Sequence, residues 1–199
     1  MKRLLFIVSL LGITSLLYAQ DTKKILDKAA SAVNQKSGMK ASFSITGGSY
    51  NGTSGTIAIK GRKFQITTPQ MIIWFNGSVM WTYVKSNEEV NVTHPNDAQL
   101  NRINPYSFIT MYRSGYTLSH EKKGGNYIAR MQAQSKNSRI QEAYVTINGK
   151  SYLPSTVKLC EKGVWSTIKL TNIQSVKLAD SAFQFNAKEH PNAEVIDLR

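Results

Sequence analysis

The segment that decides the fold lies between residues 71 and 84, where the sequence is MIIWFNGSVMWTYV. Two apolar runs, Met71–Phe75 and Val79–Val84, flank Asn76-Gly77, which favours a hairpin turn because both residues tolerate a positive φ. Successive side chains of a strand point to opposite faces, so both faces of this hairpin are apolar. An antiparallel sheet with one face in water lacks that pattern. Either helices cover the second face, or the interior of a barrel is left apolar for a ligand.

Further strands are predicted on both sides of this hairpin. From Met39 to Ile45 apolar residues alternate with polar ones, as in a half-buried strand. The remaining strands recur at intervals of roughly 8–12 residues, which is typical of an antiparallel barrel or sandwich in one domain. They are predicted at Thr56–Lys60, Phe64–Thr68, around Val90 and Val92, and at Tyr116–Ser119, Tyr127–Ala133, Ile140–Ile147, Thr156–Cys160, Trp165–Ile173 and Phe183–Phe185.

Two segments have a helical period instead. The first helix is predicted between Asp21, which can cap its N-terminus, and Gly38, which suits a left-handed stop. The second is predicted from Asn104, with Pro105 in its first turn, to Tyr112. The apolar stripe of the first helix consists of Ile25, Leu26, Ala29 and Val33.

Composition excludes several classes of protein. The 199 residues are 41% hydrophobic and 19% charged, which fits neither a disordered polymer nor a membrane bundle. A single Cys excludes an internal disulfide framework and a metal site built from several Cys. The net charge of +13 by itself leaves nucleic acid, acidic partners and anionic membrane surfaces open.

The N-terminus predicts export. Lys2 and Arg3 precede an apolar run that ends at Leu17, and Ala19 is a small residue at a plausible cleavage site. Residues 1–19 are therefore predicted to be a signal peptide and residues 20–199 the mature domain. The apolar run is shorter than the roughly 20 residues that a membrane-spanning helix needs. With no Cys after the cut, no lipid anchor is expected there, and an exported protein is not expected to bind nucleic acid.

The sequence contains no recognisable catalytic motif. His94, His120 and His190 are isolated from one another, have no spacing typical of a metal site, and are predicted to be surface residues. Gly52-Thr53-Ser54-Gly55 lacks the elbow motif that exposes a serine nucleophile. Cys160 follows Leu159 at the end of a predicted strand, has no obvious His partner, and is predicted to be a structural thiol. The chain is therefore not predicted to be an enzyme, and no metal or cofactor is expected.

Several short motifs follow one another in a characteristic order. The hairpin Ile72–Tyr83 precedes Asn104-Pro105-Tyr106, Tyr152-Leu153-Pro154-Ser155, Phe183-Gln184-Phe185 and Ala193–Asp197. With the signal peptide and one amphipathic helix before them, these motifs make the chain resemble the periplasmic outer-membrane lipoprotein carrier family (LolA-type). The resemblance covers essentially the whole mature chain.

The resemblance implies a mainly β fold, an unclosed antiparallel β-barrel or half-barrel, whose helices cover an apolar cavity for acyl chains. Arg62 is the nearest candidate for the family's lid latch, although the proline that accompanies that arginine in the family is missing here. The residues that the resemblance places in the cavity are Phe43, Ile45, Ile57, Ile59, Phe64, Ile66, Ile73, Phe75, Met80, Tyr106 and Ile109.

The implied function is that of a soluble, monomeric carrier in the periplasm, which ferries acylated lipoproteins from the inner to the outer membrane. The implied partners are an inner-membrane lipoprotein-release ABC transporter and an outer-membrane acceptor, either a receptor or the membrane itself. The same half-barrel also fits a periplasmic regulatory domain that senses lipids or lipoproteins. A lipid-modifying enzyme is a third class, which the missing nucleophile argues against.

Overall fold

The computed structural model describes residues 20–96, 99–100 and 110–199. The predicted signal peptide lies outside the described residues, and so does most of the second predicted helix, including Tyr106 and Ile109. The chain divides into two compact units. The first unit comprises Met1–Ala32 and Ile109–Thr167, and the second comprises Val33–Phe108 and Ile168–Arg199.

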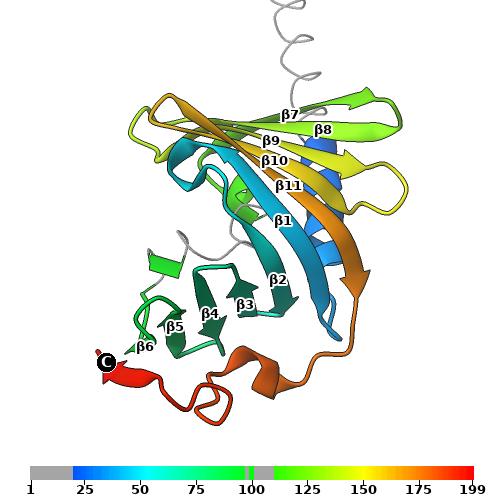
Figure 1. The fold of residues 1–199 in the computed structure, drawn as a ribbon. Helices are drawn as coiled ribbons and strands as arrows, with labels where there is room; N and C mark the ends of the chain where they lie inside the picture. Colours follow the sequence, from blue (N-terminus) through cyan, green and yellow to red (C-terminus); the bar gives the residue numbers. More distant parts are fainter. Residues whose placement is uncertain (1–19, 97–98, 101–109) are drawn as a thin grey trace, which may run out of the picture. The chain divides into compact units, whose positions relative to one another are not determined.

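The described strands form a single 12-stranded sheet in the order β12-β6-β5-β4-β3-β2-β1-β11-β10-β9-β8-β7 (Figure 1). This order has two ends, at β12 and β7, so the sheet is not closed into a barrel. The mainly β, unclosed fold that the resemblance implies is thereby confirmed. The strands are β1 (Met39–Gly47), β2 (Ser54–Lys60), β3 (Lys63–Thr67), β4 (Met71–Phe75), β5 (Met80–Val84), β6 (Glu89–Thr93), β7 (Tyr116–Lys123), β8 (Asn126–Ala133), β9 (Ile140–Asn148), β10 (Pro154–Glu161), β11 (Val164–Ser175) and β12 (Glu194–Asp197).

Pairing in the sheet departs from the antiparallel expectation at one position. Consecutive strands from β1 to β6 and from β7 to β10 pair antiparallel. In contrast, β12 pairs parallel to β6, with Val195 opposite Val90. Parallel pairing is possible here because about 100 residues separate the two strands, so no tight turn has to join them.

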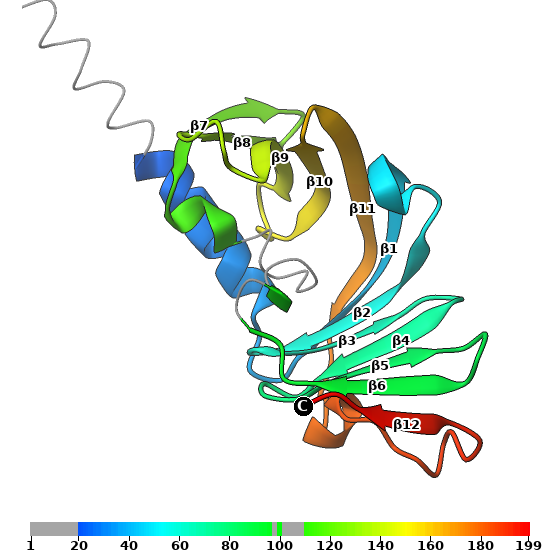
Figure 2. The ribbon, with the colours of Figure 1, turned by 90° about the vertical axis from the view of Figure 1, so that its left-hand side faces the viewer.

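The first unit packs a helix against one face of β7–β10. The helix covers residues 20–33, and both ribbon views draw it alongside these strands (Figure 2). Residue 20 is already helical, so Asp21 lies inside the helix and is not the N-cap that the sequence predicts. The buried side chains of these strands largely alternate along the chain, as in a sheet with one buried face and one more exposed face. They include Ala129, Met131, Ala143, Val145, Ile147, Val157 and Leu159.

The second unit contains β1–β6, β12 and the segment that follows β11. This segment begins after Ser175 and contains the short 3-10 helix η3 (Asp180–Phe183). In both ribbon views the segment runs alongside β2–β6. The predicted strand at Phe183–Phe185 is wrong, because η3 ends at Phe183 and no strand follows until Glu194. A two-residue alternation is too short to distinguish a strand from an extended segment that buries one aromatic ring.

The hairpin between β4 and β5 has a different turn from the predicted one. Gly77 has a positive φ of 104°, whereas Asn76 does not adopt a positive φ. Instead, the Asn76 side-chain oxygen accepts hydrogen bonds from the backbone N–H groups of Ser78 and Val79, at 3.0 and 2.9 Å. Asn therefore stabilises this turn through its side chain, as Asn commonly does in turns.

Candidate functional site

Cross-strand register divides β1–β6 into two faces, because residues directly opposite each other in neighbouring strands share a face. A first row runs Met39, Ile59, Phe64, Phe75, Met80, Thr93. A second row runs Ala41, Ile57, Ile66, Ile73, Thr82, Asn91. We call the side that carries both rows face A and the opposite side face B.

Face A gathers every predicted acyl-binding residue that the structure describes. Phe43 and Ile45 alternate with polar residues in β1 and so share a face with Ala41. The other seven belong to the two rows. The first row contains Ile59, Phe64, Phe75 and Met80, and the second contains Ile57, Ile66 and Ile73. Phe64 and Phe75 are only 1% and 2% exposed, and their ring centroids lie 5.3 Å apart. The apolar surface on this face is therefore continuous from β1 to β5.

Face B is covered by the segment after β11. One cluster joins Ala58 of β2 to Leu178 and Phe183, the latter 0% exposed. A second cluster joins Trp74, Tyr83, Val90 and Val92 to Phe185 and Ala193, which precede β12. The second apolar face of the 71–84 hairpin is thus buried by a largely irregular segment about 100 residues later in the chain.

An aromatic group in the second cluster surrounds His190. Its ring centroid lies 4.5 Å from that of Tyr83 and 5.8 Å from those of Trp74 and Phe185. His190 is therefore packed as an aromatic side chain on face B and is not an isolated surface residue. Sequence reasoning missed this role, since His190 follows Glu189 and precedes Pro191, with no apolar periodicity around it.

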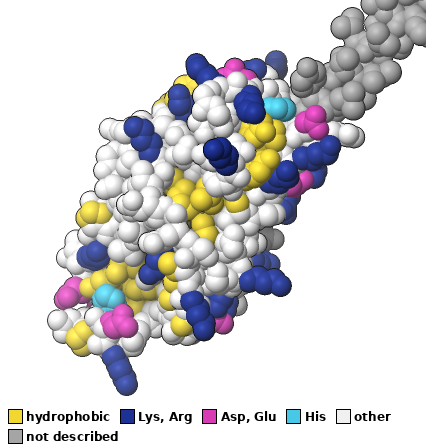
Figure 3. Space-filling view, turned by 90° about the vertical axis from the view of Figure 1, so that its right-hand side faces the viewer, with side chains coloured by type: hydrophobic (Ala, Val, Ile, Leu, Met, Phe, Trp, Pro, Cys, Tyr) yellow, Lys and Arg dark blue, Asp and Glu magenta, His cyan; other side chains and the backbone are white. Residues whose placement is uncertain are grey.

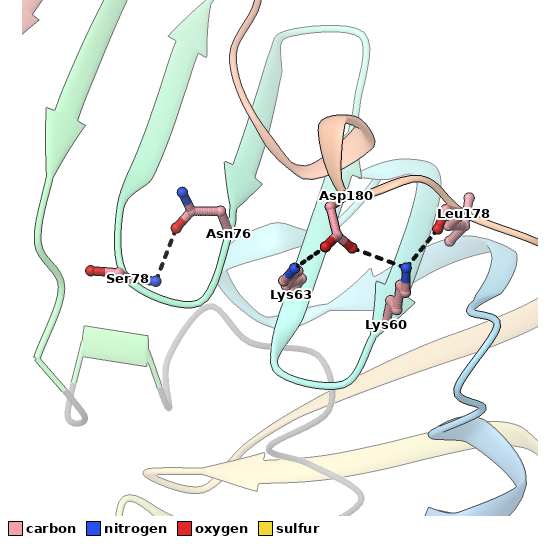
Figure 4. Close-up of polar contacts among 6 residues, drawn as sticks. All are labelled: Lys60, Lys63, Asn76, Ser78, Leu178 and Asp180. Carbon is pink, nitrogen blue, oxygen red and sulfur yellow. Dashed lines mark hydrogen bonds and ion pairs between the residues drawn. The ribbon is translucent and has the colours of Figure 1, made fainter.

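Ion pairs at the edge of face B hold η3 against β2 and β3. Asp180 lies 2.9 Å from Lys60 Nζ and 2.8 Å from Lys63 Nζ (Figure 4). Lys60 also donates a hydrogen bond of 2.8 Å to the backbone carbonyl of Leu178. The hydrogen bonds from Lys63 and then Lys60 lower the pKa of Asp180 to about 2. Sequence reasoning missed these pairs as well.

Face A becomes more polar toward β5 and β6. The first row ends in Thr93, and the second row ends in Thr82 and Asn91. The hydroxyl of Thr93 is buried, and its oxygen makes no hydrogen bond with any of the described residues. Face A is thus apolar over β1–β4, carries both apolar Met80 and polar Thr82 on β5, and has a polar border at β6.

Other predicted residues lie away from face A. Arg62 is exposed in the turn between β2 and β3, and its latching role stays a prediction. His120 Nδ1 lies 2.8 Å from the Thr22 hydroxyl, which ties β7 to the helix. Cys160 is a buried free thiol. Within the described ranges no cluster of three or more His, Cys, Asp or Glu side chains is arranged to hold a metal ion.

Basic side chains are spread over the surface and are not gathered in one patch on the face that Figure 3 shows. Lys and Arg side chains are dispersed over this face, with hydrophobic side chains visible between them. None of the helices in the described residues has the length and apolar character that crossing a membrane requires.

Comparisons with known proteins agree on the fold. The model of the family "Outer membrane lipoprotein carrier protein LolA" matches residues 14–163. No protein of curated function matches the chain. An uncharacterized conserved protein from Thermus thermophilus has a similar structure, with a TM-score of 0.61 and 10% identity over 89% of this chain and 99% of that one.

Two further solved structures are similar to the chain. A DUF1329 family protein from Desulfovibrio piger gives a TM-score of 0.50 and 13% identity over 85% of this chain and 98% of its own. A LolA superfamily protein from Nitrosomonas europaea gives a TM-score of 0.45 and 10% identity over 82% and 97%. At 10% and 13% identity, the likeness to the Thermus thermophilus and Desulfovibrio piger proteins concerns the fold alone.

Proposed function

The chain belongs to the outer membrane lipoprotein carrier (LolA) family, and from this premise we propose that it binds lipoprotein acyl chains on face A and carries them across the periplasm. The observation that carries the proposal is the unbroken apolar row on face A from Met39 to Met80. Because the segment after β11 packs on face B, face A is the side assigned to the cargo.

The energetics of acyl transfer explain why such a surface is useful. Each buried methylene is worth roughly 0.8 kcal/mol, so an acyl chain of about 16 carbons would lose on the order of 13 kcal/mol if it crossed water bare. A carrier has only to offer apolar burial comparable to that of a bilayer. Transfer then requires no chemical step on the carrier itself, in keeping with a binding protein that is not an enzyme.

The proposal includes the route and the partners. The chain is exported by the signal peptide at residues 1–19 and acts as a monomer in the periplasm. It receives acylated lipoproteins from an inner-membrane lipoprotein-release ABC transporter. It delivers them to an outer-membrane acceptor, which is a receptor or the membrane itself.

A direct test identifies lipid bound to the protein. The mature chain is purified without detergent and extracted with organic solvent, and the extract is analysed by mass spectrometry. Wild-type protein is also titrated with a fluorescent fatty-acyl probe. We expect copurified acyl lipid and saturable uptake of the probe. Wild-type protein that takes up no probe, with or without detergent, would remove the basis of the proposal.

Charge substitutions locate the binding on face A. Phe64→Glu and Ile73→Glu place a carboxylate in the apolar rows, where it has to be desolvated or neutralised, so uptake of the probe should be lost. Ile66→Glu makes the same change at a half-buried position, which is more easily tolerated by the fold. Gln65→Glu, in the same strand but on face B, is the matched control and should bind as wild type does.

Thermal unfolding of these variants separates a binding surface from a filled core. Folded variants that no longer take up the probe support the carrier. If Ile66→Glu also fails to fold while Gln65→Glu folds, face A is a packed interior, since packed interiors tolerate neither charge nor lost contacts. That result would contradict the proposal.

A further inference from the structure

The Thr93 hydroxyl is an unusual group in the described part of the chain. Its oxygen is buried, and no hydrogen-bond partner for it lies among the described residues. A buried polar group without a partner costs free energy, so native proteins supply a protein, water or ligand partner in nearly every case. The position of Thr93 in the sheet indicates which of these it is.

Thr93 is the last member of the first row of face A. It lies opposite Met80 of β5, which lies opposite Phe75 of β4. It therefore shares a face with the apolar side chains that are proposed to contact the acyl chain. Thr82 and Asn91, which end the second row, are half-buried and place further polar groups on the same border.

The dimensions of the row match an amphiphile. Neighbouring strands lie about 4.8 Å apart, so Thr93 on β6 and Ile59 on β2 are separated by four strand spacings, or roughly 19 Å along the sheet. This distance is comparable with the extended length of a long-chain acyl group. An acyl chain that follows the row has its hydrocarbon over β2–β5 and its polar end beside Thr93.

We propose that the Thr93 hydroxyl binds the carbonyl oxygen of the ester or amide that joins an acyl chain to its headgroup. The inference rests on the proposed function, since it assigns an orientation to the ligand on face A. A threonine hydroxyl can donate to a carbonyl oxygen, and none of the described residues accepts a hydrogen bond from this one. Binding satisfies it, so the site prefers acylated ligands to plain hydrocarbons.

The test compares two ligands of similar length that differ in the carbonyl group. Tritiated methyl palmitate and tritiated octadecane are delivered from cyclodextrin to the mature chain, and the affinity for each is measured by equilibrium partition. Thr93→Val keeps the shape of the side chain and removes its donor. Thr67→Val, on face B of β3, is the matched control.

We expect Thr93→Val to weaken methyl palmitate binding about fivefold, the value of one neutral hydrogen bond, and to leave octadecane binding within about twofold. Thr67→Val should change neither. Equal affinities of wild type and Thr93→Val for methyl palmitate, or equal losses for both ligands, would overturn the inference. Wild-type protein that binds neither ligand would instead contradict the proposed function.

Stability in the absence of ligand is the second measurement. If the hydroxyl has no partner in the free protein, Thr93→Val exchanges an unsatisfied group for a methyl, and the melting temperature should be unchanged or higher. A clearly lower melting temperature would show that an internal water or another group satisfies Thr93 without ligand. That outcome would also overturn the inference.

Discussion

The hydroxyl of Tyr112 donates a hydrogen bond of 2.5 Å to the carboxylate of Asp27. This bond ties the short 3-10 helix η2 (Met111–Arg113) to the helix at residues 20–33 within the first unit. Asp27 also pairs with Lys23 at 2.8 Å. The hydrogen bond from Lys23, followed by that from Tyr112, lowers the pKa of Asp27. Burial, followed by the bond to Asp27, raises the pKa of Tyr112 to about 12.

Replacing Tyr112 with Phe should destabilise the fold at neutral pH. Tyr112 is 3% exposed, but the Asp27 side chain is 43% exposed, so solvent screens the carboxylate. The loss of unfolding free energy should therefore be about 1 kcal/mol, which is below the usual value of a hydrogen bond to a charged group. Because the folded pKa of Asp27 lies below its ordinary 3.8, this stabilisation is present above pH 3.8 and is lost as the pH falls through the folded value.

Urea unfolding of wild type and Tyr112→Phe from pH 7 to pH 2 measures this effect. The difference in unfolding free energy between the two proteins should become smaller below about pH 4. Tyr50→Phe, at a tyrosine that is 70% exposed, is the control and should follow wild type. A gap that stays constant down to pH 2 would show that Asp27 is not the acceptor that stabilises the fold.

The stability of the fold at alkaline pH should also depend on Tyr112. A folded pKa of about 12, above the ordinary 10.0, means that its contribution is complete below pH 10 and is lost as the pH rises through about 12. Ultraviolet titration of tyrosinate formation should show one tyrosine that ionises at a higher pH than an ordinary tyrosine, and this step should be missing in Tyr112→Phe. Asp27→Asn should lower that pKa only in part, because burial is the larger cause. A complete return to 10.0 would contradict this order of causes.

Asp180 should titrate well below a free aspartate. Its pKa of about 2 is held down first by the hydrogen bond from Lys63 and then by that from Lys60. Stability from these pairs should therefore be present above pH 3.8 and fall as the pH drops through about 2. Carbon-detected NMR measures the carboxyl directly.

Single lysine variants test the assignment of the Asp180 pKa. Lys63→Met should raise it toward 3.8, and Lys60→Met should do so to a lesser extent. Arg62→Met, in the turn between the two lysines, serves as the control. An Asp180 pKa near 3.8 in wild type would mean that the pairs are absent in solution.

Phe183 should be the anchor of the segment that covers face B. It is 0% exposed and packs with Ala58 and Leu178. Phe183→Ala should cost about 3–5 kcal/mol, through lost burial and the cavity it leaves. Ser181→Ala, exposed in the same 3-10 helix, should change the unfolding free energy by less than about 0.5 kcal/mol. Equal unfolding curves for wild type and Phe183→Ala would show that this segment does not cover face B in solution.

Local sequence pattern predicted most of the strands. The two-residue alternation from Met39 to Ile45 and the apolar runs around Asn76-Gly77 place β1, β4 and β5 correctly to within about two residues. The face that a residue occupies follows from its parity in the strand, because successive side chains point to opposite faces. This is why all the described cavity candidates, from Phe43 to Met80, lie together on face A.

The tertiary structure decided what covers each face and which distant residues pair. Sequence alone established that the 71–84 hairpin is apolar on both sides, but not that Phe183 and Phe185 bury one of them. The Lys60–Asp180 pair, the aromatic surroundings of His190 and the parallel pairing of β12 were likewise not predictable. These contacts join residues about 100 or more positions apart, and they form because the fold brings the segments together. A local period records which side of an element is apolar, but it carries no information about the segment that will lie against that side.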